Sequence, residues 1–175
     1  MRITPNQLQT NAARLRELNR RIHEEYAKQP HGPEHHAACA RFHNEYGVLA
    51  FPGELGEWDS KNKTPDARFV DALLVFLETD PRFHRSGYAK QRMLKYLKQV
   101  PLTVLQRERC ECLIMRCLDE PLRSCGREYA RLAGAIQSSV VFEAAQERAL
   151  SENANVRFQA MRILDRIRAR RPKGS

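Results

Sequence analysis

The sequence predicts an all-α protein built from seven to eight short helices. Apolar residues recur every three or four positions along most of the 175 residues, which is the spacing of a helix with one buried face. Proline, glycine and polar capping residues interrupt this pattern every 12 to 20 residues. No segment alternates apolar and polar residues for long, as a half-buried strand would. We therefore expect a single helical domain over residues 1–175.

Residues 1–46 are expected to form a helical hairpin. Thr4 and Gln7 flank a proline in a capping-box pattern, which predicts a helix start. The apolar face that follows runs to about Lys28, and two prolines and a glycine in residues 29–33 stop it. A second helix is predicted from about Pro33 to residue 46, with Gly47 as its C-terminal cap.

Residues 47–65 contain three glycines and two prolines and predict a long loop. Long loops in compact domains are often functional. This one carries three large apolar residues, Phe51, Leu55 and Trp58. We expect the loop to fold back onto the helices and these residues to supply the anchors for a partner protein.

Residues 66–170 predict six further helices, ahead of a basic tail at 171–175. Polar residues at or before their first turns are suited to capping: Thr64, Ser86, Thr103, Ser138 or Ser139, and Asn153 or Asn155. The segment 112–118 is apolar nearly all round, which is typical of a central buried helix.

Short helices joined by tight turns can form either a bundle or a stacked solenoid. The last helix carries Asn153, then Val156-Arg157, Ala160 and Ile163-Leu164. This order resembles the second-helix signature of HEAT and armadillo-type repeats, with residues 139–150 as the first helix of the repeat. The resemblance implies a HEAT-like stack over 66–170. It also implies an adaptor that binds proteins, since most members do so. A minority bind nucleic acid, including HEAT-like DNA glycosylases, but no catalytic aspartate can be matched here.

The net charge of +9 is concentrated in two basic runs. The first lies between Asp80 and Glu108, where no acidic residue occurs, and the second lies in 156–175, where Asp165 faces seven basic residues. A basic surface attracts anionic partners, so three interpretations remain open: a solvated face, a nucleic-acid site or a site for an acidic protein. The candidate anion-binding residues share one helical sector within each run: Arg85, Arg92 and Lys95, and Arg162, Arg166 and Arg170.

The second predicted helix also carries His36, Cys39 and His43 on one face, and His35 shares nearly the same face. Imidazole and thiolate are zinc ligands. Residues seven apart on a helix are about 10 Å apart, however, so three ligands for one ion are hard to arrange there. We expect no cofactor and keep this trio as the zinc candidate. The other cysteines, at 110, 112, 117 and 125, are expected to pack as small apolar groups.

No apolar run approaches the ~18 residues of a membrane span, and the first residues lack the apolar region of a signal peptide. Five cysteines, an odd number, fit reduced thiols in the cytoplasm. Nothing in the sequence positively supports an enzyme. The leading hypothesis is a non-enzymatic adaptor for a partner protein, the alternative is a nucleic-acid-binding accessory protein, and the third is a metal-dependent enzyme using the His/Cys helix.

Overall fold

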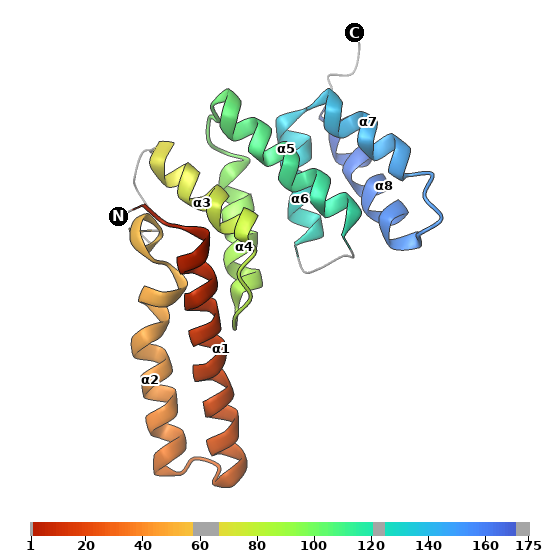
Figure 1. Ribbon diagram of the computed structural model, residues 1–175. Helices are drawn as coiled ribbons and strands as arrows, with labels where there is room; N and C mark the ends of the chain where they lie inside the picture. Colours follow the sequence, from red (N-terminus) through yellow and green to blue (C-terminus); the bar gives the residue numbers. More distant parts are fainter. Residues whose placement is uncertain (1, 58–66, 121–124, 171–175) are drawn as a thin grey trace. The chain divides into compact units, whose positions relative to one another are not determined.

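The computed structural model describes residues 2–57, 67–120 and 125–170 (Figure 1). Over these residues the protein is helical and contains no β-strand, which confirms the predicted class. Its contacts divide the chain into two compact units, Met1–Ser86 and Gly87–Ser175, where we expected one domain. None of the described helices is long and apolar enough to span a membrane.

The N-terminal unit begins with α1 (Pro5–Lys28) and α2 (Pro33–Ala50), which run antiparallel as a hairpin (Figure 1). The Thr4 hydroxyl accepts a hydrogen bond from the Gln7 amide, so the predicted N-cap of α1 is confirmed. Leu15 and Leu18 of α1 pack against Phe42 of α2 in a buried cluster. The apolar spacing along α1 therefore forms the expected inner face.

The predicted end of the second helix is wrong. Instead of stopping at Gly47, α2 continues to Ala50, and the Phe51 amide donates to the Gly47 carbonyl across the last turn. Ala50 is fully buried in the hairpin core. The Leu49 carbonyl also accepts a hydrogen bond from the Asn11 side chain of α1. Tertiary contacts with α1 thus extend the helix past a residue of low intrinsic helix propensity.

The described part of the segment predicted as a loop contains helical residues, because α2 extends into it. After α2, a 3₁₀-helix η1 (Gly53–Glu57) follows, and the predicted helix start at 64–66 lies outside the described residues. Next comes α3 (Ala67–Thr79), which packs against α1 and η1. Its apolar face, including Leu73 and Phe76, is fully buried.

The C-terminal unit contains most of α4 (Ser86–Leu97) and all of α5 (Val104–Asp119), α6 (Gly126–Ile136), α7 (Ser139–Arg148) and α8 (Ala154–Arg168) (Figure 1). Local capping sets these boundaries. Thr103 and Gln106 form the predicted reciprocal capping box of α5, and Ser138 caps α7. The Asn153 side chain accepts from two backbone amides at the start of α8.

Helix α8 packs against α5, α6 and α7. At the α6–α8 contact, a Cβ added at Gly134 would lie 2.8 Å from the Arg166 carbonyl oxygen. Only glycine permits this approach without a shift of one helix. The predicted central helix is confirmed by Ile114 and Leu118 of α5, which are fully buried. HEAT-like stacking of these helices stays a prediction.

Candidate functional site

Leu55, predicted as a partner-binding anchor, lies in the interior. Its side chain is 0% exposed, so Leu55 offers no surface to a partner. Phe51 is partly buried and packs against the Leu15–Phe42 core, and Trp58 lies outside the described residues. The expectation that this segment folds back onto the helices is confirmed for Phe51 and Leu55, and the burial that results removes Leu55 from the list of anchors.

The outer face of α8 carries large apolar side chains that the sequence pattern did not single out. Ala160, Ile163 and Ile167 point inward and are buried. Side chains on the opposite side of the helix must therefore face solvent. There Phe158 is 52% exposed and Met161 is 54% exposed. The signal was available in the sequence, because both residues fall off the Ala160–Ile163 face when the helix is projected along its axis.

Phe158, Met161 and Arg162 form one contiguous group, which we call the α8 outer face. Met161 and Arg162 lie three and four positions after Phe158, so both side chains are neighbours of the Phe158 ring on the helix surface. The Arg162 guanidinium carbon lies 4.6 Å from the centre of the Phe158 ring, a cation–π contact. This contact places the half-buried Arg162 beside the exposed ring of Phe158.

Three arginines of α8 differ in their ion pairing from Arg20 of α1, which pairs with Glu17 and Glu24. Within the described part of the chain, no carboxylate lies within ion-pair distance of Arg162, Arg166 or Arg168. Asp165 is the only acidic residue of α8. The predicted residue Arg170 follows directly after the helix and is exposed. The α8 outer face is therefore both apolar and positively charged.

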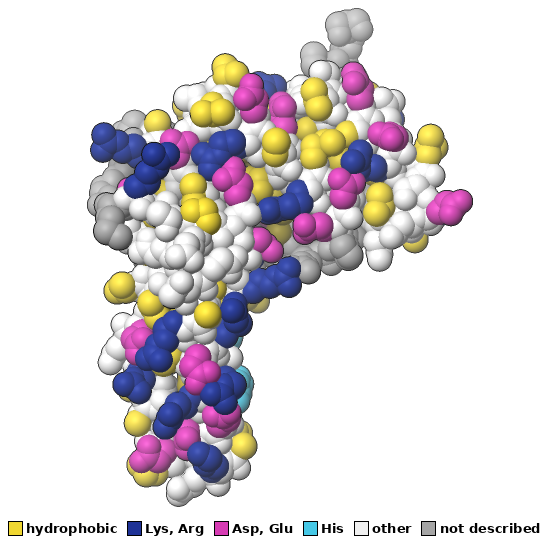
Figure 2. Space-filling view, viewed as in Figure 1, with side chains coloured by type: hydrophobic (Ala, Val, Ile, Leu, Met, Phe, Trp, Pro, Cys, Tyr) yellow, Lys and Arg dark blue, Asp and Glu magenta, His cyan; other side chains and the backbone are white. Residues whose placement is uncertain are grey.

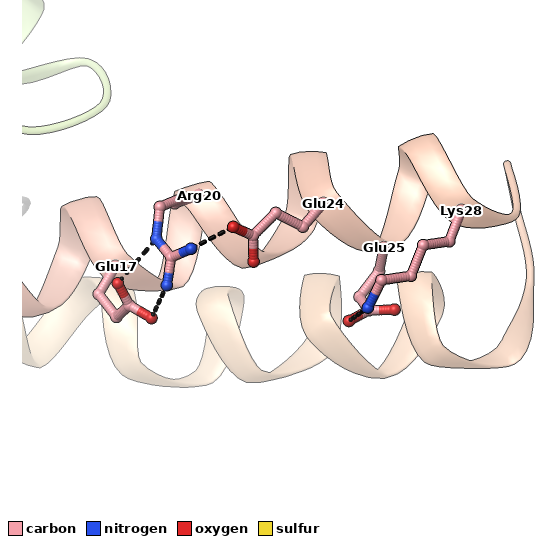
Figure 3. A network of polar contacts seen from close by, with 5 residues as sticks. All are labelled: Glu17, Arg20, Glu24, Glu25 and Lys28. Carbon is pink, nitrogen blue, oxygen red and sulfur yellow. Dashed lines mark hydrogen bonds and ion pairs between the residues drawn. The ribbon is translucent and has the colours of Figure 1, made fainter.

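On α1, Arg20 and Lys28 pair with carboxylates of the same helix, and Arg14 pairs with Glu45 of α2. Figure 3 shows Arg20 between Glu17 and Glu24, and Lys28 bonded to Glu25 at 3.0 Å. The Arg20 side chain lowers the pKa of the Glu17 carboxyl mainly by donating hydrogen bonds to it. Positive and negative side chains are accordingly interspersed over the hairpin in Figure 2.

The remaining predicted anion-binding residues lie elsewhere. Arg85 is exposed in the N-terminal unit with a backbone φ of 65°, and Arg92 and Lys95 are exposed on α4. The neighbouring Lys90, from the same basic run, is buried. That these groups and the α8 arginines bind an anionic partner stays a prediction.

Within the described residues, the cysteines of the C-terminal unit belong to no cluster of three or more metal-ligating side chains. Burial raises the pKa of the Cys117 thiol to about 12, so the thiol carries its proton at neutral pH and is a poor nucleophile. Cys117 accepts a hydrogen bond from the buried Gln159 side chain at 3.2 Å. Cys110 and Cys125 are buried, as expected for core residues, whereas Cys112 is exposed, contrary to that expectation.

The predicted zinc trio is not brought together among the described residues. His43 is exposed farther along α2, and the imidazoles that approach His36 are those of His31 and His35. The sequence analysis treated His31 only as one of residues 29–33, which end the first helix, and not as a metal ligand. Three histidines within six residues were the available signal, and the turn conformation that joins them is a property of the folded hairpin.

Comparison with known proteins adds no assignment: no family model, no curated protein and no solved structure matches this chain.

Proposed function

We propose that this protein is a non-enzymatic interaction module that binds an acidic surface of a partner protein through the α8 outer face. The observation that carries the proposal is a pair of exposed apolar side chains, Phe158 and Met161, beside the half-buried Arg162. Among the described residues, no carboxylate pairs with Arg162, Arg166 or Arg168 of this helix. This surface replaces the Phe51–Leu55 segment as the leading candidate for the contact.

The composition of the α8 outer face favours a protein as the partner. Aromatic residues, methionine and arginine are the side chains enriched in the cores of protein–protein interfaces. Phe158 and Met161 would lose their remaining exposure in a complex, which is favourable because apolar surface leaves water. The unpaired arginines would meet carboxylates of the partner, and such charge complementarity speeds association and selects the partner.

Nucleic acid is the second candidate, because unpaired arginines also suit phosphate groups. Arg162 and Arg166 lie four residues apart on α8, and Arg170 follows the end of the helix. Sequence-independent binding to single strands, however, uses a series of aromatic side chains on which successive bases stack. The α8 outer face supplies one such ring, Phe158. The observations therefore rank nucleic acid below an acidic protein.

The experiment compares capture of proteins by three immobilised chains from one lysate, half of it untreated and half treated with nuclease. These are the unchanged chain, the Phe158→Ala variant, and the control variant Leu105→Ala. Leu105 is 66% exposed on α5 in the same unit, so its replacement removes similar apolar surface away from α8. We expect a set of captured proteins shared by the unchanged chain and the control and absent with Phe158→Ala.

Affinity measurements on a captured protein then test the charged part of the surface. Loss of a buried aromatic anchor costs ~2 kcal/mol or more, about 30-fold in Kd. Arg162→Gln should also weaken binding, and more at low salt than at high salt. Equal capture by Phe158→Ala and the unchanged chain would refute the proposal. Capture that disappears on nuclease treatment would make nucleic acid the leading candidate.

A further inference from the structure

Three imidazole rings converge at the turn of the hairpin. His31 lies between α1 and α2, and His35 and His36 lie in the first turns of α2. One ring nitrogen from each lies within 4.8 Å of those of the other two. The ring centres of His31 and His35 are 5.7 Å apart, and those of His35 and His36 are 5.8 Å apart.

The local sequence explains why the rings meet. Helix α1 ends at Lys28, and the Gly32 amide donates to the Gln29 carbonyl to close the turn. His31 adopts a left-handed backbone conformation with φ of 60°, which histidine tolerates better than most residues do. Pro33 then begins α2. The turn therefore directs His31 back toward the residues of the new helix.

Tyr26, near the end of α1, supports two of the rings from the side. Its ring packs edge-on against His31, with centres 5.7 Å apart, and against His35, with centres 5.3 Å apart. These contacts restrict the orientations of both imidazoles. A group of ligands that is already ordered loses less conformational entropy when it binds an ion.

The two ring nitrogens of His35 are in different environments. Nε2 lies 3.4 Å from the Cys39 sulfur and forms a hydrogen bond with it. Nδ1 is buried and has no hydrogen-bond partner among the residues that the structure describes. If Nε2 carries the proton and donates it to Cys39, the lone pair is on Nδ1. A metal-binding histidine typically donates its second ring N–H to a neighbouring acceptor in this way, which fixes the ring and its tautomer.

We propose that His31, His35 and His36 bind one zinc ion, with His35 ligating through Nδ1 and Cys39 orienting that ring. Neutral imidazoles are suitable zinc ligands, with Zn–N distances of about 2.0–2.1 Å. In a tetrahedral site these distances place the nitrogens about 3.4 Å apart, so modest side-chain rotations from the observed separations suffice. Three protein ligands leave the fourth position for water or for a group from another molecule.

This site differs from the trio His36, Cys39 and His43 predicted from helical spacing. In the new site His31 and His35 replace Cys39 and His43 as ligands beside His36. The ion would therefore lie at the N-terminal end of α2. The site lies in the N-terminal unit and does not depend on the function proposed for α8.

The test is titration of the full-length chain with ZnCl₂ alone, followed by calorimetry and elemental analysis. The variants are His31→Asn, His35→Gln and His36→Gln, and circular dichroism confirms that each is folded. Asparagine is chosen at position 31 because it accepts a left-handed conformation. The matched control is His43→Gln, which removes an exposed imidazole from the same helix.

We expect one zinc ion per chain, at least tenfold weaker binding in each of the three variants, and unchanged binding in the control. No zinc binding by the unchanged chain would overturn the proposal. So would equal weakening by His43→Gln, or full affinity in His31→Asn.

A second measurement tests the role of Cys39. Loss of an outer-shell hydrogen-bond partner typically weakens metal binding 10–100-fold, so Cys39→Ala should weaken zinc binding within that range and Cys39→Ser should restore most of it. The chain loaded with Co²⁺ should lack the charge-transfer absorption of a cobalt–thiolate bond. Such a band would show that Cys39 is a ligand and would overturn the three-imidazole site.

Discussion

Replacing glycine by alanine should have opposite effects at two positions, Gly47 and Gly134. Both lie inside helices, where alanine is favoured over glycine by about 0.5–1 kcal/mol. A Cβ at Gly47 in α2 would meet no atom within 4 Å, so Gly47→Ala should raise the free energy of unfolding by that amount. A Cβ at Gly134 in α6 would lie 2.8 Å from the Arg166 carbonyl oxygen and 3.2 Å from its carbon.

At Gly134 the nearby backbone atoms of Arg166 determine whether alanine raises or lowers the free energy of unfolding. Backbone cannot rotate aside as a flexible side chain can, so α6 and α8 must separate. Overpacking of this kind costs typically 1–3 kcal/mol. After the gain in helix propensity is subtracted, Gly134→Ala should lower the free energy of unfolding by ~1–2 kcal/mol. For a unit of this size, 1 kcal/mol corresponds to about 4–8 °C in Tm.

Hydrogen–deuterium exchange read by mass spectrometry is the suitable assay, because it reports on the two units separately, and thermal unfolding supplies the Tm. Amide protection should rise in α2 for Gly47→Ala and fall in α6 and α8 for Gly134→Ala. A Gly134→Ala chain as stable as the original would refute the close helix approach. A destabilised Gly47→Ala chain would refute the continuation of α2 through this position.

The remaining predictions concern the C-terminal unit. Leu113→Ala should destabilise the chain by ~2–5 kcal/mol in a urea titration, because the buried Leu113 side chain leaves a cavity; a loss below ~1 kcal/mol would contradict a central α5. Asn153→Ala should cost about 1 kcal/mol, because two amides of α8 lose their acceptor, and Asn153→Ser, tested by the same titration, should retain most of the stability. Iodoacetamide at pH 8 should label the exposed Cys112 before Cys117. The raised pKa of Cys117, about 12, keeps that thiol protonated until far higher pH. Faster labelling of Cys117 would contradict its burial.

Local signals in the sequence were sufficient to predict the helices. Thr4, Thr103, Ser138 and Asn153 cap helices as expected, because an N-cap acts through backbone amides only two or three residues away. The inner faces of the helices were predicted for a similar reason, since helical periodicity is encoded within each segment.

Features that depend on distant residues were not predicted. The continuation of α2 past Gly47 depends on α1. The burial of Gln159 depends on the Gly126 carbonyl, which accepts its hydrogen bond at 3.0 Å, and on Cys117. Nothing near Gln159 in the sequence indicates these partners, because they belong to α6 and α5.

In the candidate sites, too, features set by neighbouring residues were predicted and features set by distant residues were not. Arg162 and Arg166 were identified from their spacing along one helix, which is local information. Leu55 was predicted to bind a partner protein. An apolar residue in a glycine-rich segment can equally well be an exposed anchor or a buried core residue, and the local sequence does not distinguish the two. The convergence of His31 with His35 depends on the left-handed backbone at the turn, for which the sequence offered no specific signal.

The contacts of α8 affect the order in which the chain can fold during synthesis. The α1–α2 hairpin joins residues 5–50, so its contacts can form soon after that segment leaves the ribosome. Helix α6, by contrast, packs against Arg166, and the Gln137 side chain after α6 donates to the Ile167 carbonyl. Until the ribosome has translated α8, the surface of α6 that meets it stays exposed to water. A nascent chain stalled before residue 154 would thus present that surface to chaperones, while its hairpin could already be folded.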